Sequence, residues 1–451
     1  MNPQKMIHRM YMAGSSAQSW AQGKFTPSGV FVILSVVICA MMGMDTTRTM
    51  AFQAFTFLLF LLIASVVASL FSKPNFSARI ILPPSTTVGA PFRYSVEITN
   101  QGPNAVDGAL FKMNLKDPRP SYHEFTTMKS ARERNINAWD RYVGPIRWRE
   151  IIEQRVPVKF KEISLPMIPP KGTVHMNLEA VPINRGYIRL ESVTVGALDP
   201  FGLIKTLCRI PVNISKPVFP RRFTTKPFSL PGKRKYNQGG VALASAVGDA
   251  EEFVGLRDYR PGDPMRKIHW RSWARTGSPV VKEYQEEYYS RHALLLDTFL
   301  DVDISGHFED AVSVASSFIA NMETQDALLD LMFIGTETYL FTSGRSLGAT
   351  SNMLEVLASV IPATGKNFGL LACAAYERLH LIGGVVCVFL SWDQQRQDFV
   401  EGLISSGMPT KVFLLVESVP PEGIDPGPMR QTPNMFHILP AGSIEEVMAS
   451  L

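Results

Sequence analysis

Cysteine is scarce in this sequence, and the few cysteines are far apart. They form no Cys-x-x-Cys pair and no cluster with histidine: Cys39, Cys208, Cys373 and Cys387. Zinc sites of the usual kind need closely spaced ligands, so the sequence gives no indication of one. We expect four reduced and mostly buried thiols in a reducing compartment.

Charge is also sparse. Charged residues make up 19% of the chain, against about 25% in an average soluble protein. The formal net charge of +5 is too small to indicate nucleic-acid binding by itself. Apolar residues are abundant instead. They make up 46% of the 451 residues, enough to fill the cores of two or three domains of roughly 100–200 residues each.

Two long uncharged runs stand near the N-terminus. Residues 29–44 read GVFVILSVVICAMMGM, and residues 50–71 read MAFQAFTFLLFLLIASVVASLF. Extended back to Phe25, the first run reaches the ~20 residues that a helix needs to cross a bilayer. The second run follows at once with no Ala-x-Ala site between them, which argues against a cleavable signal peptide. The sequence therefore predicts a transmembrane hairpin of two helices within residues 25–72.

The basic residues around these runs predict their orientation. Lys5, Arg9 and Lys24 stand before the first run, and Lys73 and Arg79 follow the second. The connection between the runs holds Arg48, whose charge Asp45 offsets. Basic residues favour the cytoplasmic side. We therefore expect an inner (plasma) membrane protein whose N-terminal tail, residues 1–24, and soluble part, residues 73–451, are both cytoplasmic.

The soluble part begins with a predicted antiparallel β-sandwich over residues 73–215. Residues 78–115 and 170–215 alternate apolar and polar side chains between turn signals, as half-buried strands do. Residues 116–169 interrupt this pattern with charged and aromatic residues that follow no sustained period. This insert is either an excursion from the sandwich or a partner-binding loop, and the sequence leaves both open.

A basic, proline-rich linker is predicted over residues 216–247. Its first part, residues 216–235, holds seven Lys or Arg and no acid. It is either a solvated linker or a contact with anionic lipid headgroups. Each basic residue near such a surface contributes about 1 kcal/mol to binding. From residue 291 to 451, apolar strands alternate with helices. That alternation predicts an α/β domain with a parallel sheet covered on both faces, whose sites form at the carboxyl ends of the strands.

Residues 248–290 mix charged and aromatic side chains closely. Asp263 and His269 are candidates for an acid–base pair, but no nucleophile at an elbow accompanies them. The arginines could clamp a phosphate, but the segment has no glycine-rich loop of the Walker type. Arginine with tryptophan could bind nucleic acid, but five nearby glutamates oppose that. The remaining interpretation is structural: a buried cluster of ion pairs and aromatic rings that locks the segment onto the α/β domain.

This segment closely resembles the signature of the domain of unknown function 58 family. The matching residues are Gly255, Leu256, Arg257, Tyr259, Pro261, Gly262, Asp263, Arg266, His269, Trp270, Arg275, Gly277 and Lys282. Upstream, Arg185-Gly186-Tyr187 and the turn from Asp199 to Leu203 resemble the family too. The resemblance implies a von Willebrand A-like C-terminal domain and a MoxR-type AAA+ ATPase as partner, in the assembly or maturation of other proteins.

A von Willebrand A domain binds Mg²⁺ through Asp-x-Ser-x-Ser after its first strand, using hard oxygen ligands. Here Asp297 and Asp301 take the outer positions, Phe299 replaces the first serine, and Asp393 ends a later strand. Phenylalanine cannot bind a metal, and strand-end aspartates often cap the following helix. We therefore expect no metal and no other cofactor, with these three carboxylates as the only weak candidates.

The leading hypothesis is a membrane-anchored adaptor or scaffold without enzymatic activity, because no convincing catalytic constellation is present. The alternatives are a hydrolase that uses Asp263 and His269, and a structural protein of the cell envelope.

Overall fold

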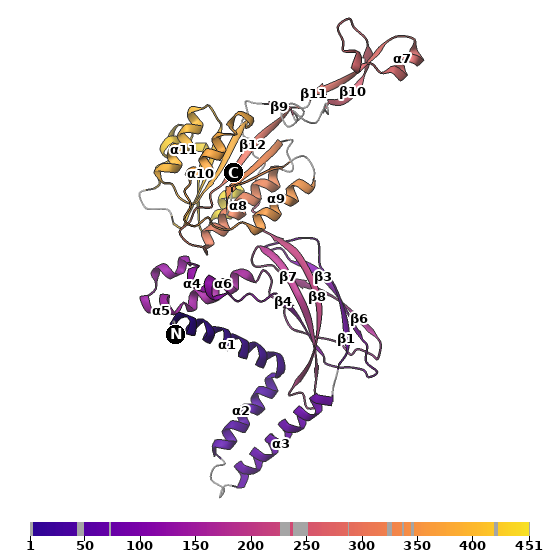
Figure 1. Cartoon of the computed structure of the whole chain (residues 1–451), viewed down its shortest axis with the longest axis vertical. Coiled ribbons are helices and arrows are strands. Elements are labelled where there is room, and N and C mark those ends of the chain that lie inside the picture. Colours follow the sequence, from indigo (N-terminus) through magenta and orange to yellow (C-terminus); the bar gives the residue numbers. More distant parts are fainter. Residues whose placement is uncertain are drawn as a thin grey trace. The chain divides into compact units, whose positions relative to one another are not determined.

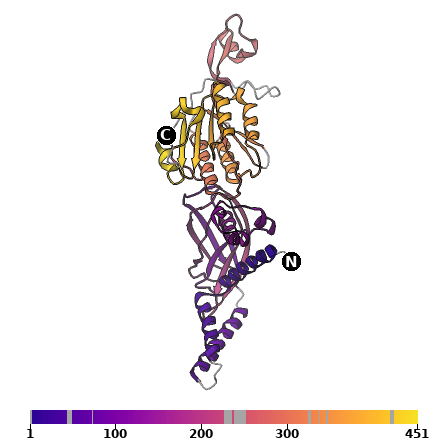
Figure 2. The same cartoon turned by 90° about the vertical axis from the view of Figure 1, so that its left-hand side faces the viewer.

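The computed structural model describes residues 3–42, 49–71, 74–225, 235–237, 251–286, 288–322, 327–335, 338–343, 347–418 and 423–450 (Figures 1 and 2). The chain forms two compact units. The first comprises Met1–Arg221 with the short segments Val302–Ser305 and Glu355–Val360, and the second comprises Arg222–Asp301, Gly306–Leu354 and Ile361–Leu451.

Three helices open the first unit: α1 (Pro3–Lys24), α2 (Pro27–Met42) and α3 (Thr49–Phe71). Within α3, Met50–Leu70 is the one helical segment of the described ranges that is long and apolar enough to cross a membrane. Only 6% of its most apolar stretch is buried. The apolar α2 lies beside it (Figure 1) but is described over 16 residues only, and residues 43–44 of the predicted first run lie outside the description.

Two β-sheets follow in the first unit. The smaller has the order β1-β3-β6, from β1 (Phe76–Ile81), β3 (Phe92–Asn100) and β6 (Thr173–Ala180). The larger has the order β2-β8-β7-β4-β5, from β2 (Thr86–Thr87), β4 (Leu110–Leu115), β5 (Ile163–Ser164), β7 (Gly186–Leu198) and β8 (Lys205–Phe219). The strands pair antiparallel except β2, which pairs parallel with β8.

The two sheets share one apolar core. Burial alternates along β3, as the period of two in its sequence requires. Val96 and Ile98 of β3 are fully buried in the same cluster as Phe111 of β4 and Ile188 of β7. The predicted β structure is therefore present on both sides of the insert. Strand β8 continues to Phe219, so the first residues of the predicted linker are strand. Residues 226–234 and 238–250 of that linker lie outside the description.

The insert is helical. It contains α4 (Tyr122–Thr127), a 3₁₀ turn (Ala131–Asn135), α5 (Ala138–Val143) and α6 (Pro145–Arg155). At the start of α4, the Ser121 hydroxyl accepts a hydrogen bond from the Glu124 amide, and the Glu124 carboxylate accepts one from the Ser121 amide. Hydrogen bonds from Arg155 and Ser121 lower the pKa of Glu124 to about 2. Helices this short span too few turns to show a period in the sequence, which is why the pattern alone did not predict them.

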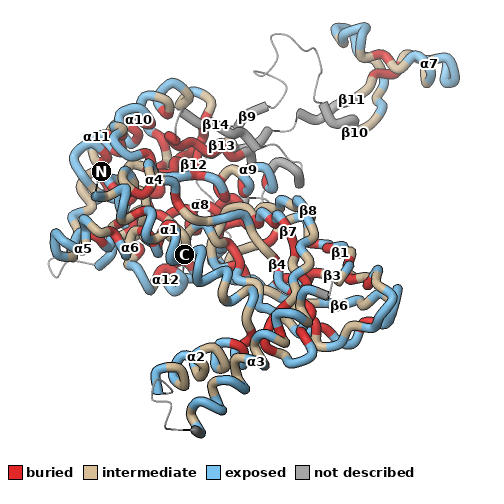
Figure 3. Tube along the Cα trace, turned by 60° about the horizontal axis from the view of Figure 1, so that its bottom comes forward, coloured by how far each residue is buried: buried red, intermediate tan, exposed pale blue. Residues whose placement is uncertain are grey.

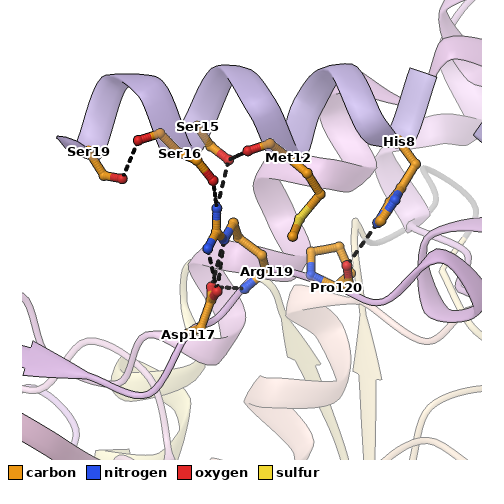
Figure 4. A network of polar contacts seen from close by, with 8 residues as sticks. All are labelled: His8, Met12, Ser15, Ser16, Ser19, Asp117, Arg119 and Pro120. Carbon is orange, nitrogen blue, oxygen red and sulfur yellow. Dashed lines mark hydrogen bonds and ion pairs between the residues drawn. The ribbon is translucent and has the colours of Figure 1, made fainter. Parts of the chain in front are cut away.

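The N-terminal tail is a helix that packs on this insert (Figure 4). His8 Nε2 lies 3.0 Å from the Pro120 carbonyl oxygen, and the Tyr11 ring stacks on Trp148 with centroids 5.2 Å apart. The Arg119 guanidinium donates to the Ser16 hydroxyl at 2.5 Å. The insert is therefore a helical excursion from the sandwich that forms a platform for α1, and a partner-binding role for it stays a prediction.

The second unit contains a seven-stranded sheet. Six strands follow the order β14-β13-β12-β15-β16-β17, and β9 (Lys235–Asn237) pairs with β12. The six are β12 (Tyr288–Leu296), β13 (Ala327–Ile334), β14 (Thr338–Ser343), β15 (Gly384–Phe389), β16 (Thr410–Val416) and β17 (Phe436–Pro440). All pairs are parallel except β13–β14 and β9–β12. The strand order reverses between β12 and β15, where sheets of this kind form a crevice at the carboxyl ends.

Helices cover both faces of this sheet. They are α8 (Gly306–Met322), α9 (Leu347–Ser359), α10 (Gly369–Tyr376), α11 (Gln394–Ser405) and α12 (Ile444–Ser450), with 3₁₀ turns at Leu379–Leu381, Gly427–Gln431 and Pro433–Met435. On one face, Phe318 of α8 lies 4.7 Å from the Phe413 ring of β16. On the other, Leu371 of α10 and Phe399 of α11 pack with Leu295 of β12. Because both faces are covered, the strands read as continuous apolar runs.

A half-buried histidine of β17 generates a pH prediction. His437 stacks on Phe413 at 5.2 Å, and burial together with the Lys411 charge lowers its pKa to about 4. The unfolded chain protonates this histidine near its ordinary pKa of about 6.5. Between these two values the unfolded state binds more protons than the folded state, so stability falls as the pH falls.

We expect His437→Phe, which keeps the ring stack, to flatten the fall in melting temperature between these pH values. The exposed His380 provides the matched control as His380→Gln, which should keep the wild-type slope. Thermal unfolding of the full chain in detergent at stepped pH measures both variants. Equal slopes for the wild type and His437→Phe would contradict the prediction.

Candidate functional site

The signature residues form a separate hairpin, which we call the signature hairpin (Glu251–Glu286). Its strands β10 (Glu251–Asp258) and β11 (Val280–Glu286) pair antiparallel as a two-stranded sheet of their own. Between them lie a 3₁₀ turn (Met265–Lys267) and α7 (Trp270–Thr276). Gly277 ends α7 in the left-handed conformation at φ 73°, and Gly262 bends the turn at φ 105°. Both conformations favour glycine.

An ion pair closes the turn of this hairpin. The Arg257 guanidinium donates to both oxygens of Asp263, at 2.8 and 2.7 Å. The Arg260 amide donates to the same carboxylate at 2.8 Å. The hydrogen bond from Arg257 lowers the pKa of Asp263 to about 2. This carboxylate is therefore a weak base held by its own turn, and its role is to fix the backbone.

The other half of the candidate acid–base pair is engaged elsewhere. His269 Nδ1 lies 2.7 Å from the Ser272 hydroxyl, three residues along α7, and its amide donates to the Val280 carbonyl. His269 and Asp263 thus have separate partners, and the hydrogen bonds described for these residues do not join them. The geometry gives no support to a hydrolase built on this pair.

Part of the side-chain surface of the hairpin is exposed, and most of α7 is coloured as exposed in Figure 3. Trp270 stacks on the half-buried Trp273 at 5.3 Å and is 62% exposed, and Met265 is 73% exposed. Over residues 255–282, whose side chains the structure describes, the buried ones are Ile268, Val280 and Val281. The predicted burial is therefore wrong for Trp270, because a two-stranded sheet has no second layer to cover its ring.

The remaining signature residues lie along the same hairpin. Gly255 follows an irregularity in the register of β10, and Leu256 pairs with Lys282 across the two strands. The Tyr259 amide donates to the Pro279 carbonyl at 3.0 Å. Three signature positions are exposed at the turn or beyond it: Pro261, Arg266 and Arg275.

The upstream turn from Asp199 to Leu203 lies in the first unit, where it contacts the apolar helices. The Asp199 carboxylate accepts the amides of Leu203 and Ile204 at 2.7 and 2.8 Å, which closes the turn. Its second oxygen accepts the Ser65 hydroxyl of α3 at 2.5 Å. The Leu203 carbonyl accepts the Thr26 amide next to α2. A Cβ at Gly29 would lie 2.2 Å from that carbonyl oxygen, so only glycine allows this approach. The turn therefore ties both apolar helices to the sandwich.

The strand-end carboxylates of the second unit surround an arginine. Asp297, directly after β12, is fully buried. Its Oδ2 accepts the Arg396 Nε at 2.7 Å and the Leu390 amide at 3.1 Å, and its Oδ1 accepts the Phe299 amide at 3.0 Å. Both oxygens of this carboxylate therefore accept hydrogen bonds from protein donors.

Arg396 lies in the first turn of α11 and is 4% exposed. Asp393 caps that helix by accepting the Arg396 amide, and it also accepts Arg396 Nη1 at 2.5 Å. The guanidinium lies 4.8 Å above the Phe368 ring. It therefore stands between the carboxylates of Asp297 and Asp393, at the point where the strand order reverses.

A divalent metal does not fit this arrangement. The guanidinium already pairs with both Asp297 and Asp393 and lies where a cation would bind, Phe299 packs edge-on against Phe368 at 5.9 Å, and Asp301 is exposed. Within the described ranges, His, Cys, Asp and Glu form no group of three that could hold a metal. Sequence reasoning missed Arg396. The signal for it was the capping aspartate three residues earlier, which brings an arginine of the first helical turn to the strand ends.

Comparisons with known proteins find a family match over part of the chain and a distant curated relative. The family described as "Protein of unknown function DUF58" matches residues 255–396, from the signature hairpin to Arg396. The uncharacterized protein YeaD of Bacillus subtilis (strain 168) is 27% identical over 190 residues. That match covers 42% of this chain and 46% of the relative, so the chain spans about half the length of the curated relative.

Solved structures give weaker likenesses. A CARDB domain from Pyrococcus furiosus, solved with di-metal ions, is 14% identical, with 33% of this chain and 90% of that chain covered and a TM-score of 0.17. A GH20 exo-β-N-acetylglucosaminidase from Vibrio harveyi is 6% identical, with 76% and 57% covered and a TM-score of 0.16. Neither likeness bears on the fold or the chemistry.

The buried ion pair generates a stability prediction. Arg396→Met should lower stability by about 3–5 kcal/mol, because it leaves the buried Asp297 carboxylate without a compensating charge. Adding Asp297→Asn should restore part of that loss. The exposed pair of Arg430 with Asp425 provides the control, since Arg430→Met should cost below about 1 kcal/mol.

Denaturant unfolding of the full chain in detergent measures these differences. We also expect that EDTA leaves the wild-type transition unchanged, because the guanidinium occupies the position that a cation would take. Similar losses for the two arginine variants, or a wild-type transition that EDTA shifts to lower denaturant, would contradict this account.

Proposed function

We propose that this protein is a membrane-anchored adaptor that engages a MoxR-type AAA+ ATPase at the cytoplasmic face of the inner membrane, in the assembly or maturation of other proteins. The observation that carries the proposal is the signature hairpin. It combines a fixed backbone with exposed aromatic and basic side chains in a chain that also has a helix able to cross a membrane.

The anchor in this proposal is the pair α2 and α3. Large apolar side chains cover α3 without burial, including Phe57 at 65% and Phe60 at 70% exposure, and such a surface is unfavourable in water. We propose that α2 crosses the bilayer beside it as a two-helix hairpin. The basic residues at both ends favour a cytoplasmic location for the termini.

The partner surface in this proposal is the tip of the signature hairpin. Trp270 and Met265 project beside the exposed arginines Arg266, Arg271 and Arg275. Tryptophan, methionine and arginine are the side chains that protein interfaces favour. The Arg257–Asp263 pair holds the turn before any partner binds, which lowers the entropy cost of association.

The α/β unit is proposed to be von Willebrand A-like. Its support is the strand order, with an antiparallel edge strand β14 and carboxylates at the reversal point. Partners of such domains are engaged through a bound metal. Here Arg396 pairs with those carboxylates instead, so the proposed adaptor engages its partner through the hairpin and without a metal at the strand ends.

Co-purification at native expression tests this function. We expect an AAA+ ATPase in detergent eluates of the wild-type bait, and at least about tenfold less with Trp270→Ala combined with Met265→Ala, because interface anchors contribute about 1–2 kcal/mol each and about 1.4 kcal/mol is a factor of ten in affinity. The matched control is Trp139→Ala, since Trp139 is 72% exposed on α5 of the first unit. It should retain the ATPase at the wild-type amount.

Two results would count against the adaptor. One is an intact wild-type bait that recovers no ATPase. The other is equal recovery with the hairpin variant and the control, which would move the partner surface away from the hairpin.

A further inference from the structure

Helix α1 packs one of its faces against the insert. Figure 4 shows His8, Met12, Ser15, Ser16 and Ser19 on the side of α1 that faces the segment from Asp117 to Pro120. His8 is buried there against aromatic rings of the insert. This packing explains one face of the helix, and the opposite face is largely exposed among the described residues.

The opposite face carries an apolar stripe. Its members recur at intervals of four and three residues: Met6, Met10, Ala13, Ala17 and Trp20. At about 100° per residue these positions share one side of the helix, roughly opposite the side that faces the insert. All five are exposed, with Met6 at 52%, Met10 at 64% and Trp20 at 60%.

The charge on this helix has one sign. Residues 1–24 contain Lys5, Arg9 and Lys24 and no acid. Lys24 follows Trp20 at the end of the stripe, and Lys5 and Arg9 flank its beginning. An apolar stripe flanked by basic residues has the pattern of a helix that lies in the surface of an anionic membrane.

The junction with α2 fixes where the stripe lies. The Trp20 ring contacts Phe25 at 5.8 Å, edge to face. The Thr26 hydroxyl donates to the Gly202 carbonyl at 2.7 Å, in the same turn that holds α3 through Ser65. Because α1 ends at this junction, its stripe is held close to the level at which the apolar helices leave the sandwich.

We propose that α1 is an interfacial helix, whose stripe from Met6 to Trp20 lies at the boundary between headgroups and acyl chains of an anionic bilayer. Lys5, Arg9 and Lys24 contact the lipid phosphates. The insert covers the inner face of α1, so the helix is enclosed between lipid and the helical platform. This inference rests on the proposed membrane anchoring, and it assigns the insert a role in holding α1 at the surface.

Spin-label depth measurements on the full chain in nanodiscs of phosphatidylcholine and phosphatidylserine test the proposal. Single cysteines replace Met10, Ala17, Ser19 or Phe57 after the partly or fully exposed Cys39, Cys208 and Cys373 have been changed to serine. Labels at 10 and 17 should collide more with oxygen than with a water-soluble nickel complex. The label at 19, on the other face, should show the reverse, and the label at 57 should be deepest.

The outcomes separate the two proposals. Water exposure at 10 and 17 with a deep label at 57 overturns the interfacial helix and leaves the anchor intact, whereas a water-exposed label at 57 overturns the anchor itself. Spin–spin broadening between copies at 10 and 17 would make the stripe a contact between two chains and would also overturn the proposal. In pure phosphatidylcholine the labels at 10 and 17 should become shallower, and unchanged depth would refute the role of anionic headgroups.

Discussion

The second unit depends on one buried charge pair, between Arg396 and Asp297. Parallel strands bring polar strand ends together at the reversal point of the sheet, and a buried carboxylate there requires a compensating charge. Here the charge belongs to the chain itself. The guanidinium also bonds the capping Asp393 and covers the Phe368 ring. One side chain thereby fixes the start of α11 against β12 and occupies the place between the two carboxylates that a cation would otherwise take.

A buried carboxylate also organises the first unit. Asp199 closes its own turn through two backbone amides and accepts the Ser65 hydroxyl of α3. The same turn receives Thr26 and leaves room only for glycine at position 29. In both units a short polar contact determines where helices begin or dock, while apolar burial supplies most of the driving force for folding.

These fixed parts contrast with the exposed ones. The signature hairpin, the apolar surface of α3 and the outer stripe of α1 all present side chains that are unfavourable in water. A protein that used its reversal point for chemistry would need free polar groups there, but those of Asp297 and Asp393 are occupied. Exposed aromatic, basic and apolar side chains are suited to binding, and this is the physical reason for proposing an adaptor.

The sequence by itself determined the local patterns: alternating strands around the insert, apolar parallel strands after residue 291, an apolar helix at Met50–Leu70 and the signature turn at Pro261-Gly262. These follow from periods and turn chemistry that neighbouring residues encode. Only the tertiary structure decided that Arg396 meets Asp297, 99 positions away, and that α1 docks on the insert. It also decided which signature side chains stay exposed. Contacts between distant residues depend on how the elements pack, and a single sequence carries no periodic signal for that packing.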